Sequence, residues 1–303
     1  MNSKELQTIF HRLDVGSVSY DEPMSKHTTW KIGGPADMLV IPSEISHLQL
    51  LASTCAEHQI PWMVVGRGSN LLVKDGGIRG VVIKLSDNFA NVSVAGNQLT
   101  AQAGRSFVSA ANTAIRNGLQ GLEFATGIPG TVGGAVMMNA GAHGGETRDV
   151  LISADIVEED GSIRTLQNRD LQFAYRYSIL KDCPRIVVQA TFQLQPGNTE
   201  EMQKKVRGWT KRRQTTQPLQ LPNCGSVFRN PENTHAGFLI EQSGLKGTVI
   251  GGAQISELHG NFIVNVNHAK AADVLALIEL VQTTVHNRHG ITLIPEVRIV
   301  GED

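Results

Sequence analysis

The sequence lacks an excess of charge of either sign. Lys and Arg together number 27, and Asp and Glu number 28, so the formal net charge is −1. A general polyanion binder usually carries a clear basic excess, so this balance excludes a nucleic-acid-binding protein. With 41% hydrophobic and 18% charged residues, the chain is too apolar and too evenly charged to be disordered. Its 303 residues suffice for two domains with a buried core.

Cysteine is scarce, and long apolar runs are missing. Cys55, Cys183 and Cys224 are odd in number, far apart and form no CxxC pair. We therefore expect neither a disulfide framework nor a structural zinc site, and a reducing cytosol suits the chain best. The N-terminus has no apolar signal-peptide core, and no run of about 18 apolar residues occurs. We expect a cytoplasmic protein without a membrane partner.

Several common catalytic signatures are also missing. The sequence has no GxxxxGK[ST] phosphate loop, no HExxH zinc motif and no GxSxG nucleophile elbow. Residues 66–71 (GRGSNL) begin like the dinucleotide motif GxGxxG, but Leu71 stands where the third glycine is needed. These absences exclude a P-loop enzyme and a zinc protease of this type, and they disfavour a Rossmann site.

The chain pattern predicts short strands and helices separated by glycine turns. Strand, helix, strand in residues 38–65 indicates a small α/β unit, and the last 100 residues or so indicate an α+β domain. The expected elements are helices over 4–13, 45–55, 107–117 (capped by Ser106) and 274–285 (ended by Gly290), strands over 38–41, 62–65, 80–84, 152–157 and 186–194, a hairpin around Gly96-Asn97, and a strand over 291–300 interrupted at Pro295. Residues 196–198 (PGN) mark a domain boundary.

What the sequence does have is glycine, 31 in all. Seven of these glycines lie in residues 127–145, and the segment 125–135 has a GxxGxxGG rhythm without any charge. Glycine allows close approach of backbone N–H groups to a ligand, and successive N–H groups can form an anion-binding nest. Together with residues 66–70, these loops could clasp one extended ligand with a diphosphate. The alternative is that the glycines serve only tight turns.

A few polar residues are candidates for chemistry. Arg176 lies between two tyrosines. It could bind a carboxylate through two parallel N–H···O bonds of its guanidinium, or be an ordinary surface arginine. Ser226 could donate a proton or merely cap a turn. Glu296 follows a proline in an apolar strand and faces either solvent or a cleft. Cys224 shows no sign of activation, and the basic run 204–213 is either a solvated helix face or a landing site for an anion. We expect His259, His286 and His289 to be ordinary histidines.

Six segments in this order and spacing resemble the UDP-N-acetylenolpyruvoylglucosamine reductase family, also called UDP-N-acetylmuramate dehydrogenase. They are residues 29–36 (TWKIGGPA), 66–73 (GRGSNLLV), 121–145, 175–178 (YRYS), 223–231 (NCGSVFRNP) and 294–299 (IPEVRI). The short stretch between Arg176 and Ser226 is similar to that of the shorter subclass, which lacks an extra loop over the substrate.

The resemblance implies an α+β fold. It consists of a two-subdomain FAD-binding domain of the PCMH (vanillyl-alcohol-oxidase) type and a C-terminal α+β substrate-binding domain. The implied domains are an N-terminal helical segment (1–26), the FAD-binding domain (27–196, with subdomains 27–79 and 80–196) and the substrate domain (197–303). The implied FAD contacts are Gly66, Arg67, Gly68, Ser69, Asn70, Leu71, Thr126, Gly127, Ile128, Gly130, Thr131, Gly133 and Gly134.

The implied activity is reduction of UDP-N-acetylglucosamine enolpyruvate by NADPH through FAD, in peptidoglycan precursor synthesis. A hydride passes from flavin N5 to C3 of the enolpyruvyl group and a proton is added at C2. By resemblance, Arg176 stabilises the developing enolate, Glu296 assists at it and Ser226 protonates C2. The implied substrate contacts are Tyr175, Arg213, Asn223, Arg229 and Asn230. We expect a monomer whose partners are small molecules. The alternatives are another PCMH-type flavin oxidoreductase and a non-catalytic nucleotide-sugar-binding protein.

Overall fold

The computed structural model describes residues 3–303 of the chain. Residues 1 and 2, which open the predicted N-terminal segment 1–26, lie outside the described residues. The chain forms two compact units. Unit 1 comprises Met1–Asp21, Asp37–Arg67 and Gly80–Thr210, and unit 2 comprises Glu22–Ala36, Gly68–Arg79 and Lys211–Asp303. These units are the parts of the chain whose residues contact one another most. The functional domains 27–196 and 197–303 stay a prediction.

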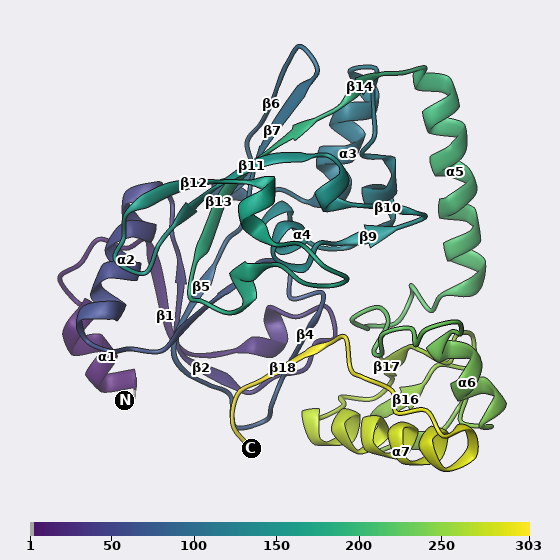
Figure 1. Cartoon of the computed structure of the whole chain (residues 1–303). Coiled ribbons are helices and arrows are strands. Elements are labelled where there is room, and N and C mark those ends of the chain that lie inside the picture. The colour runs from purple at the N-terminus through teal and green to yellow at the C-terminus, as the bar shows by residue number, and fades with distance from the viewer. Residues whose placement is uncertain (1–2) are drawn as a thin grey trace. The chain divides into compact units, whose positions relative to one another are not determined.

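Unit 1 is built around two sheets. Its elements, some of which extend into unit 2, are α1 (Ser3–Phe10), β1 (Ser17–Pro23), β2 (Pro35–Ile41), α2 (Ile45–Glu57), β3 (Trp62–Val65), β5 (Ile78–Lys84), β6 (Val92–Ala95), β7 (Gln98–Gln102), α3 (Phe107–Arg116), β8 (Leu119–Gln120), α4 (Val132–Met138), β9 (Gly141–Ala142), β10 (Gly145–Glu146), β11 (Leu151–Val157), β12 (Ile163–Gln167), β13 (Ile186–Gln193), β14 (Gln195–Pro196) and α5 (Thr199–Thr216). A four-stranded sheet has the order β1-β2-β5-β3, and a five-stranded antiparallel sheet has the order β12-β11-β13-β7-β6 (Figure 1).

The local sequence explains the helices of unit 1. In α2 the residues at helical spacing, Leu48, Leu51 and Cys55, are all buried. In α3 the Ser106 hydroxyl accepts a hydrogen bond from the backbone N–H of Ser109 at 3.4 Å, so the predicted cap is confirmed. The apolar face of α3 joins the core, where the rings of Phe107 and Phe124 meet edge to face with centroids 6.0 Å apart.

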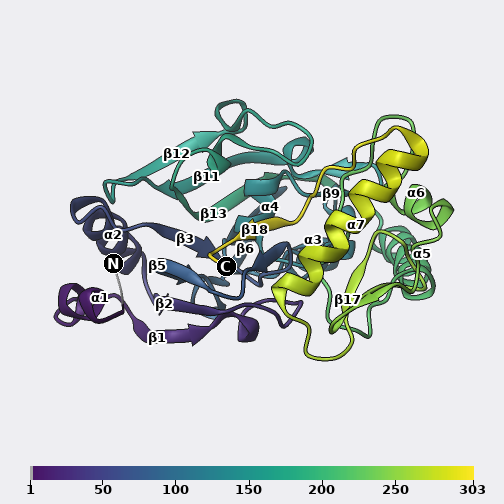
Figure 2. The ribbon, with the colours of Figure 1, turned by 90° about the horizontal axis from the view of Figure 1, so that it is seen from below.

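Unit 2 is smaller and draws on three segments of the chain. Its elements are β4 (Leu71–Val73), α6 (Ala236–Gln242), β15 (Val249–Ile250), β16 (Ala253–Ile255), β17 (Ile263–Asn265), α7 (Ala271–His289) and β18 (Arg298–Val300). Strands β15, β16 and β17 form an antiparallel sheet, and α7 packs beside it (Figure 2). β18 pairs in parallel with β4. The core includes the fully buried Trp30, whose indole N–H donates to the carbonyl of Ile263 at 2.8 Å.

The predicted elements differ from the observed ones mainly at their ends. The first helix, predicted over 4–13, ends at Phe10. The last helix is longer than predicted, and Gly290 ends it with a φ of 68°, as expected for a left-handed terminator. The strand predicted over 291–300 is wrong in extent because only Arg298–Val300 is strand. Within the described residues, no helix is long and apolar enough to cross a membrane.

Candidate active site

The first glycine-rich loop, residues 66–71, follows β3 and leads into β4. Gly68 has a φ of 62°, and a Cβ added there would lie 2.3 Å from the carbonyl oxygen of His27, so only glycine fits. Asn70 connects the loop to residues near the C-terminus. Its side-chain amide donates to the carbonyl of Glu296 at 3.2 Å, and its own carbonyl accepts from the N–H of Arg298 at 3.1 Å.

The second loop, residues 126–134, leads into α4. The Thr131 hydroxyl caps that helix by accepting from the N–H of Gly134 at 3.4 Å. The first loop meets it here: a Cβ added at Gly66 would lie 2.4 Å from the Thr131 hydroxyl oxygen. At the far side of the loop, a Cβ at Gly133 would lie 2.9 Å from the Cβ of Ala103. Glycine at positions 66 and 133 therefore permits these close approaches, and glycine loops of this kind suit an extended cofactor that needs close approach to peptide groups.

Arg176 lies in a tight turn of unit 1. Ala174 and Tyr177 exchange two backbone hydrogen bonds of 3.1 and 3.2 Å, and Arg176 between them has a φ of 56°. A non-glycine residue in this conformation costs about 1–3 kcal/mol, and such strain is concentrated at functional sites. The guanidinium Nη2 donates to the carbonyl of Gly141 at 3.2 Å. The half-buried arginine is thus fixed at both its backbone and its head group.

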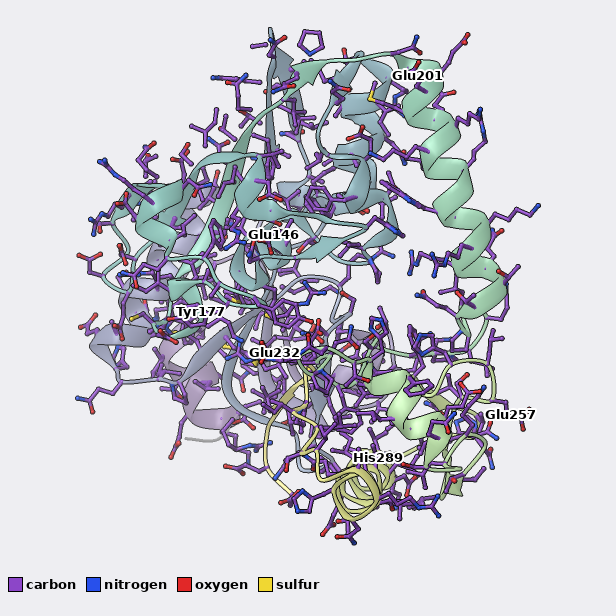
Figure 3. The ribbon with its side chains drawn as sticks, turned by 45° about the vertical axis from the view of Figure 1, so that its right-hand side comes forward. Glu146, Tyr177, Glu201, Glu232, Glu257 and His289 are labelled. Carbon is purple, nitrogen blue, oxygen red and sulfur yellow. The ribbon has the colours of Figure 1, made fainter. Side chains whose placement is uncertain are left out.

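The neighbours of Arg176 are also ordered. Its guanidinium carbon lies 5.0 Å from the centre of the half-exposed Tyr175 ring. The Tyr177 hydroxyl hydrogen-bonds Asp182, and this bond raises the pKa of the tyrosine. Figure 3 labels Tyr177 and, on β10, Glu146 in this part of unit 1. The carbonyl of Ala174 accepts a hydrogen bond from the side chain of Asn139 at 3.0 Å. Asn139 therefore stabilises the turn of residues 174–177 from another segment of the chain.

Ser226 and Glu296 lie on two segments of unit 2 that are paired through their backbones. The N–H of Glu296 donates to the carbonyl of Val227 at 2.7 Å, and the N–H of Arg229 donates to the carbonyl of Ile294 at 2.9 Å. An antiparallel bridge joins Phe228 to Pro295 between them. The sequence-predicted serine and glutamate, 70 residues apart in the chain, are thus brought into one short β-like pair.

Four other predicted substrate contacts also lie in unit 2. The Asn223 amide donates to the carbonyls of Pro218 and Leu221 and accepts from the N–H of Gly225, so it orders its own turn. The Asn230 carbonyl oxygen of the side chain accepts from the N–H of Ala236 at 3.1 Å.

The two arginines of this group differ from those asparagines. Arg213 donates to the Gln217 side chain at 3.0 Å, and burial lowers its pKa. The Nε of Arg229 is buried and, among the described residues, has no hydrogen-bond partner. A buried donor without a partner is costly. Arg229 could therefore satisfy that donor with a ligand.

Other candidates lose support as reactive groups. Burial raises the pKa of the Cys224 thiol far above neutral pH, with a smaller contribution from the charge of Glu296. A protonated thiol is a poor nucleophile. Burial lowers the pKa of His259, whose Nδ1 accepts from the N–H of Asn261 at 3.2 Å. His289 hydrogen-bonds Ser243. No group of three or more metal-ligating side chains suited to a metal ion occurs between residues 3 and 303.

Sequence reasoning missed two buried asparagines. Asn139 is fully buried in unit 1 and bonds the Arg176 turn, 35 residues on. Asn261 is 4% exposed in unit 2 and bonds the backbone beside Ser226, 33 residues back. Neither belongs to a periodic pattern or a motif with chemistry of its own. The one available signal was that Asn139 stands within the glycine-rich segment 121–145.

The comparisons with known proteins agree first on the class. Residues 36–167 match a family model described as "FAD binding domain", and they contain Gly66, Arg67 and the whole second loop. The close approach of the two glycine loops fits that cofactor. The chain is therefore an α+β flavoprotein of the FAD-binding class. Residues 217–300 match a second model, "UDP-N-acetylenolpyruvoylglucosamine reductase, C-terminal domain".

The relatives then specify the family. The chain is 48% identical to a UDP-N-acetylenolpyruvoylglucosamine reductase of Halalkalibacterium halodurans, over 99% of each chain. It is 47% identical to that of Bacillus subtilis, over 98% of each. A crystal structure of the Thermus caldophilus reductase superimposes with a TM-score of 0.80 at 34% identity, covering 93% of this chain and 98% of that one. This chain belongs to the UDP-N-acetylenolpyruvoylglucosamine reductase family.

Proposed function

We propose that this protein reduces UDP-N-acetylglucosamine enolpyruvate to UDP-N-acetylmuramate with NADPH as the reductant, a step of peptidoglycan precursor synthesis. The observation that carries the proposal is the 48% identity to a reductase named for this substrate, over 99% of both chains. The catalytic residues expected from the resemblance, Arg176, Ser226 and Glu296, are all present.

Bound FAD supplies the redox chemistry, since a flavin can take a hydride from a nicotinamide and pass it to C3 of the enolpyruvyl group. The residues proposed to hold it are those of loops 66–71 and 126–134. Their contribution is steric and electrostatic. The glycines keep side chains out of the cradle, and backbone N–H groups can bond the pyrophosphate.

The proposed role of Arg176 follows from where charge develops. Hydride addition at C3 of an enolpyruvyl ether leaves an electron pair at C2 that delocalises into the carboxylate. A guanidinium held at that carboxylate binds the transition state more tightly than the substrate. Its fixed backbone and its bond to the Gly141 carbonyl support this role, because a preorganised group loses little entropy on binding.

Ser226 and Glu296 would complete the reaction. We propose that the Ser226 hydroxyl gives its proton to C2 and that Glu296 assists at the developing enol. A serine hydroxyl is a weak acid, so it can act only towards a strongly basic carbon and from a fixed position. The pairing of their two segments through Val227 and Glu296 supports such a fixed position.

The remaining predicted contacts would hold the nucleotide sugar. Arg213 and Arg229 are proposed for the diphosphate, where the partnerless Nε of Arg229 offers a donor. Tyr175, Asn223 and Asn230 are proposed as further substrate contacts. The substrate domain 197–303, the monomeric state and the cytoplasmic location are proposed with the same family in mind, and gel filtration tests the monomer.

An anaerobic absorbance titration tests the proposed function. NADPH should bleach the flavin bands of the purified protein, and UDP-N-acetylglucosamine enolpyruvate should restore them. Bleaching without recovery would indicate a flavin reductase with another acceptor. A protein that takes up no FAD would instead be a non-catalytic binder, and the proposal would fail.

A further inference from the structure

Asn261 is a buried polar residue whose side-chain partners lie on the segment that carries Ser226. It is 4% exposed and stands in the turn between β16 and β17 of unit 2. Its side-chain amide donates to the carbonyl of Phe228 at 2.8 Å and accepts from the N–H of the same residue at 2.9 Å. Its backbone carbonyl accepts from the N–H of Val227 at 2.9 Å. Asn261 thus bonds three consecutive peptide groups, those between residues 226 and 229.

The geometry is that of a one-residue neighbouring strand. An antiparallel strand would exchange an N–H and a C=O with Phe228, and the primary amide of Asn261 supplies both. On the other side, the same segment bonds residues 294–296 through the carbonyl of Val227 and the N–H of Arg229. The backbone that follows Ser226 is therefore clamped between Asn261 and the segment that carries Glu296.

The residue before Ser226 is held locally, since the N–H of Gly225 donates to the Asn223 side chain at 2.9 Å. Gly225 has a φ of 81°, in the region that glycine alone adopts without strain, and a Cβ there would meet nothing within 4 Å. The position of Ser226 therefore depends on the bonds to the peptide groups after it as well as on this local turn. Without the Asn261 amide, the N–H and C=O of Phe228, which is 2% exposed, would be buried without partners.

A second asparagine of unit 2, the partly buried Asn265, makes similar bonds elsewhere in the unit. The Asn265 side chain donates to the carbonyl of Trp30 at 3.1 Å and accepts from the N–H of Ala269 at 2.9 Å. It makes the same two kinds of bond as Asn261, to backbone groups outside the segments of Ser226 and Glu296. Asn265 is therefore a matched control.

We propose that Asn261 is a positioning residue for proton delivery by Ser226. It fixes the Val227–Phe228 backbone and, through it, the Ser226 hydroxyl relative to the segment of Glu296. The inference rests on the proposed function, because it assigns a partner to the residue proposed to protonate C2.

The test separates the two half-reactions by anaerobic stopped-flow absorbance. Asn261→Asp keeps the acceptor for the Phe228 N–H and loses the donor to its carbonyl. We expect the NADPH-reduced variant to be reoxidised by UDP-N-acetylglucosamine enolpyruvate about tenfold to a hundredfold more slowly. Reduction by NADPH should stay within about twofold of the unaltered protein. The solvent deuterium isotope effect on reoxidation should rise, because proton delivery becomes slower.

A double variant distinguishes positioning from general damage. If Asn261 acts through Ser226, Ser226→Ala with Asn261→Asp should be reoxidised within about twofold of Ser226→Ala alone. Asn265→Asp loses the equivalent donor and should leave both half-reactions within about twofold of the unaltered protein. Asn261→Gln retains the amide donor and the amide acceptor but moves them one methylene further from the backbone. It provides a second variant if Asn261→Asp does not fold.

Three results would overturn the proposal. They are equal slowing of both half-reactions in Asn261→Asp, a double variant whose loss is the product of the two single losses, or a solvent isotope effect on reoxidation that does not change. Failure of the proposed function has a different signature. In that case the unaltered protein, reduced by NADPH, would not be reoxidised by the enolpyruvyl sugar, whatever residue stands at position 261.

Discussion

The two units hold their proposed catalytic residues in different ways. In unit 1 the side chain of Arg176 is itself bonded, to the Gly141 carbonyl, and its backbone adopts a strained turn. In unit 2 the bonds around Ser226 act on the backbone, through Asn261 on one side and the segment of Glu296 on the other. One region fixes a charged head group, and the other fixes a peptide.

This difference matches the chemistry proposed for each region. An arginine that stabilises charge must present a long, flexible side chain at a fixed point, so bonding its head group reduces the entropy it would lose. A serine has a short side chain, and the backbone determines where its hydroxyl lies. Both regions share one device, a buried asparagine that bonds the carrying segment, Asn139 in unit 1 and Asn261 in unit 2.

The largest effect should come from Arg176→Ala, which removes the charge stabilisation from unit 1. We expect reoxidation of the reduced protein by the enolpyruvyl sugar to slow by about a thousandfold, while reduction by NADPH changes by less than about threefold. Arg176→Lys should recover only part of the loss because it lacks the planar fork. Arg169→Ala, whose side chain is 88% exposed, is the control. If Arg176→Ala is reoxidised within about threefold of the normal rate, Arg176 is not a catalytic residue and the proposed role of unit 1 fails.

Gly66→Ala should act on the cofactor instead of on the chemistry. The new Cβ would lie 2.4 Å from the Thr131 hydroxyl oxygen, so the two loops must separate. Overpacking of this kind costs about 1–3 kcal/mol, and we expect FAD affinity to fall by about tenfold or more. Fluorescence titration of the apoprotein with FAD measures it. Gly208→Ala in α5, where a Cβ meets nothing within 4 Å, should bind FAD normally. Equal affinities in the two variants would contradict a cradle at Gly66.

Much of the local structure could be predicted from the sequence because it depends on neighbours in the chain. Strand β3 follows from a short apolar run bounded by Pro61 and Gly66, and the cap of α3 by Ser106 follows from capping chemistry within a few residues. The make-up of unit 2 could not be predicted in the same way. β4 pairs with β18, and Trp30 enters a core most of whose other residues lie about 200 or more positions later. No local pattern specifies such a pairing.

The candidate site could be proposed from the sequence to a similar extent. The glycine loops carry their own signal because a close backbone approach excludes other residues, and the polar trio came from the resemblance. What could not be predicted is the support of that trio. Asn139 and Asn261 look like any other asparagine until the fold brings Ala174 or Phe228 within hydrogen-bond distance.

Asn139→Asp tests whether the shared device works in unit 1. The Asn139 amide donates to Ala174 and to the Glu146 carboxylate, both at 3.0 Å, and an aspartate would lose both bonds and repel Glu146. We expect reoxidation to slow by about tenfold in Asn139→Asp alone, and adding Asn139→Asp to Arg176→Ala should cause no further loss. The solvent isotope effect should stay unchanged, in contrast to Asn261→Asp. Asn168→Asp, which loses donors to the carbonyls of Arg148 and Leu151, is the control. A raised isotope effect would mean that the two asparagines do not serve separate steps.

The smallest effect concerns pH and falls on unit 2. Burial is the main cause that lowers the pKa of His259, Lys246 lowers it further, and Glu241 acts in the opposite direction. The folded protein therefore binds a proton at His259 less readily than the unfolded chain does. Stability is unaffected well above the unfolded pKa of about 6.5, is lost as the pH falls from there towards the lower folded pKa, and changes no further below it.

A neutral His259 ring also accepts the N–H of Asn261 at 3.2 Å, so its protonation would disturb the residue that clamps the Ser226 segment. We expect the melting temperature to fall between pH 7 and pH 5 by about 2 °C more in the unaltered protein than in His259→Gln. His235→Gln, at an exposed histidine of the same unit, should keep the full pH dependence. If His259→Gln keeps it as well, another group is responsible, and the clamp at Asn261 does not depend on the ionisation of His259.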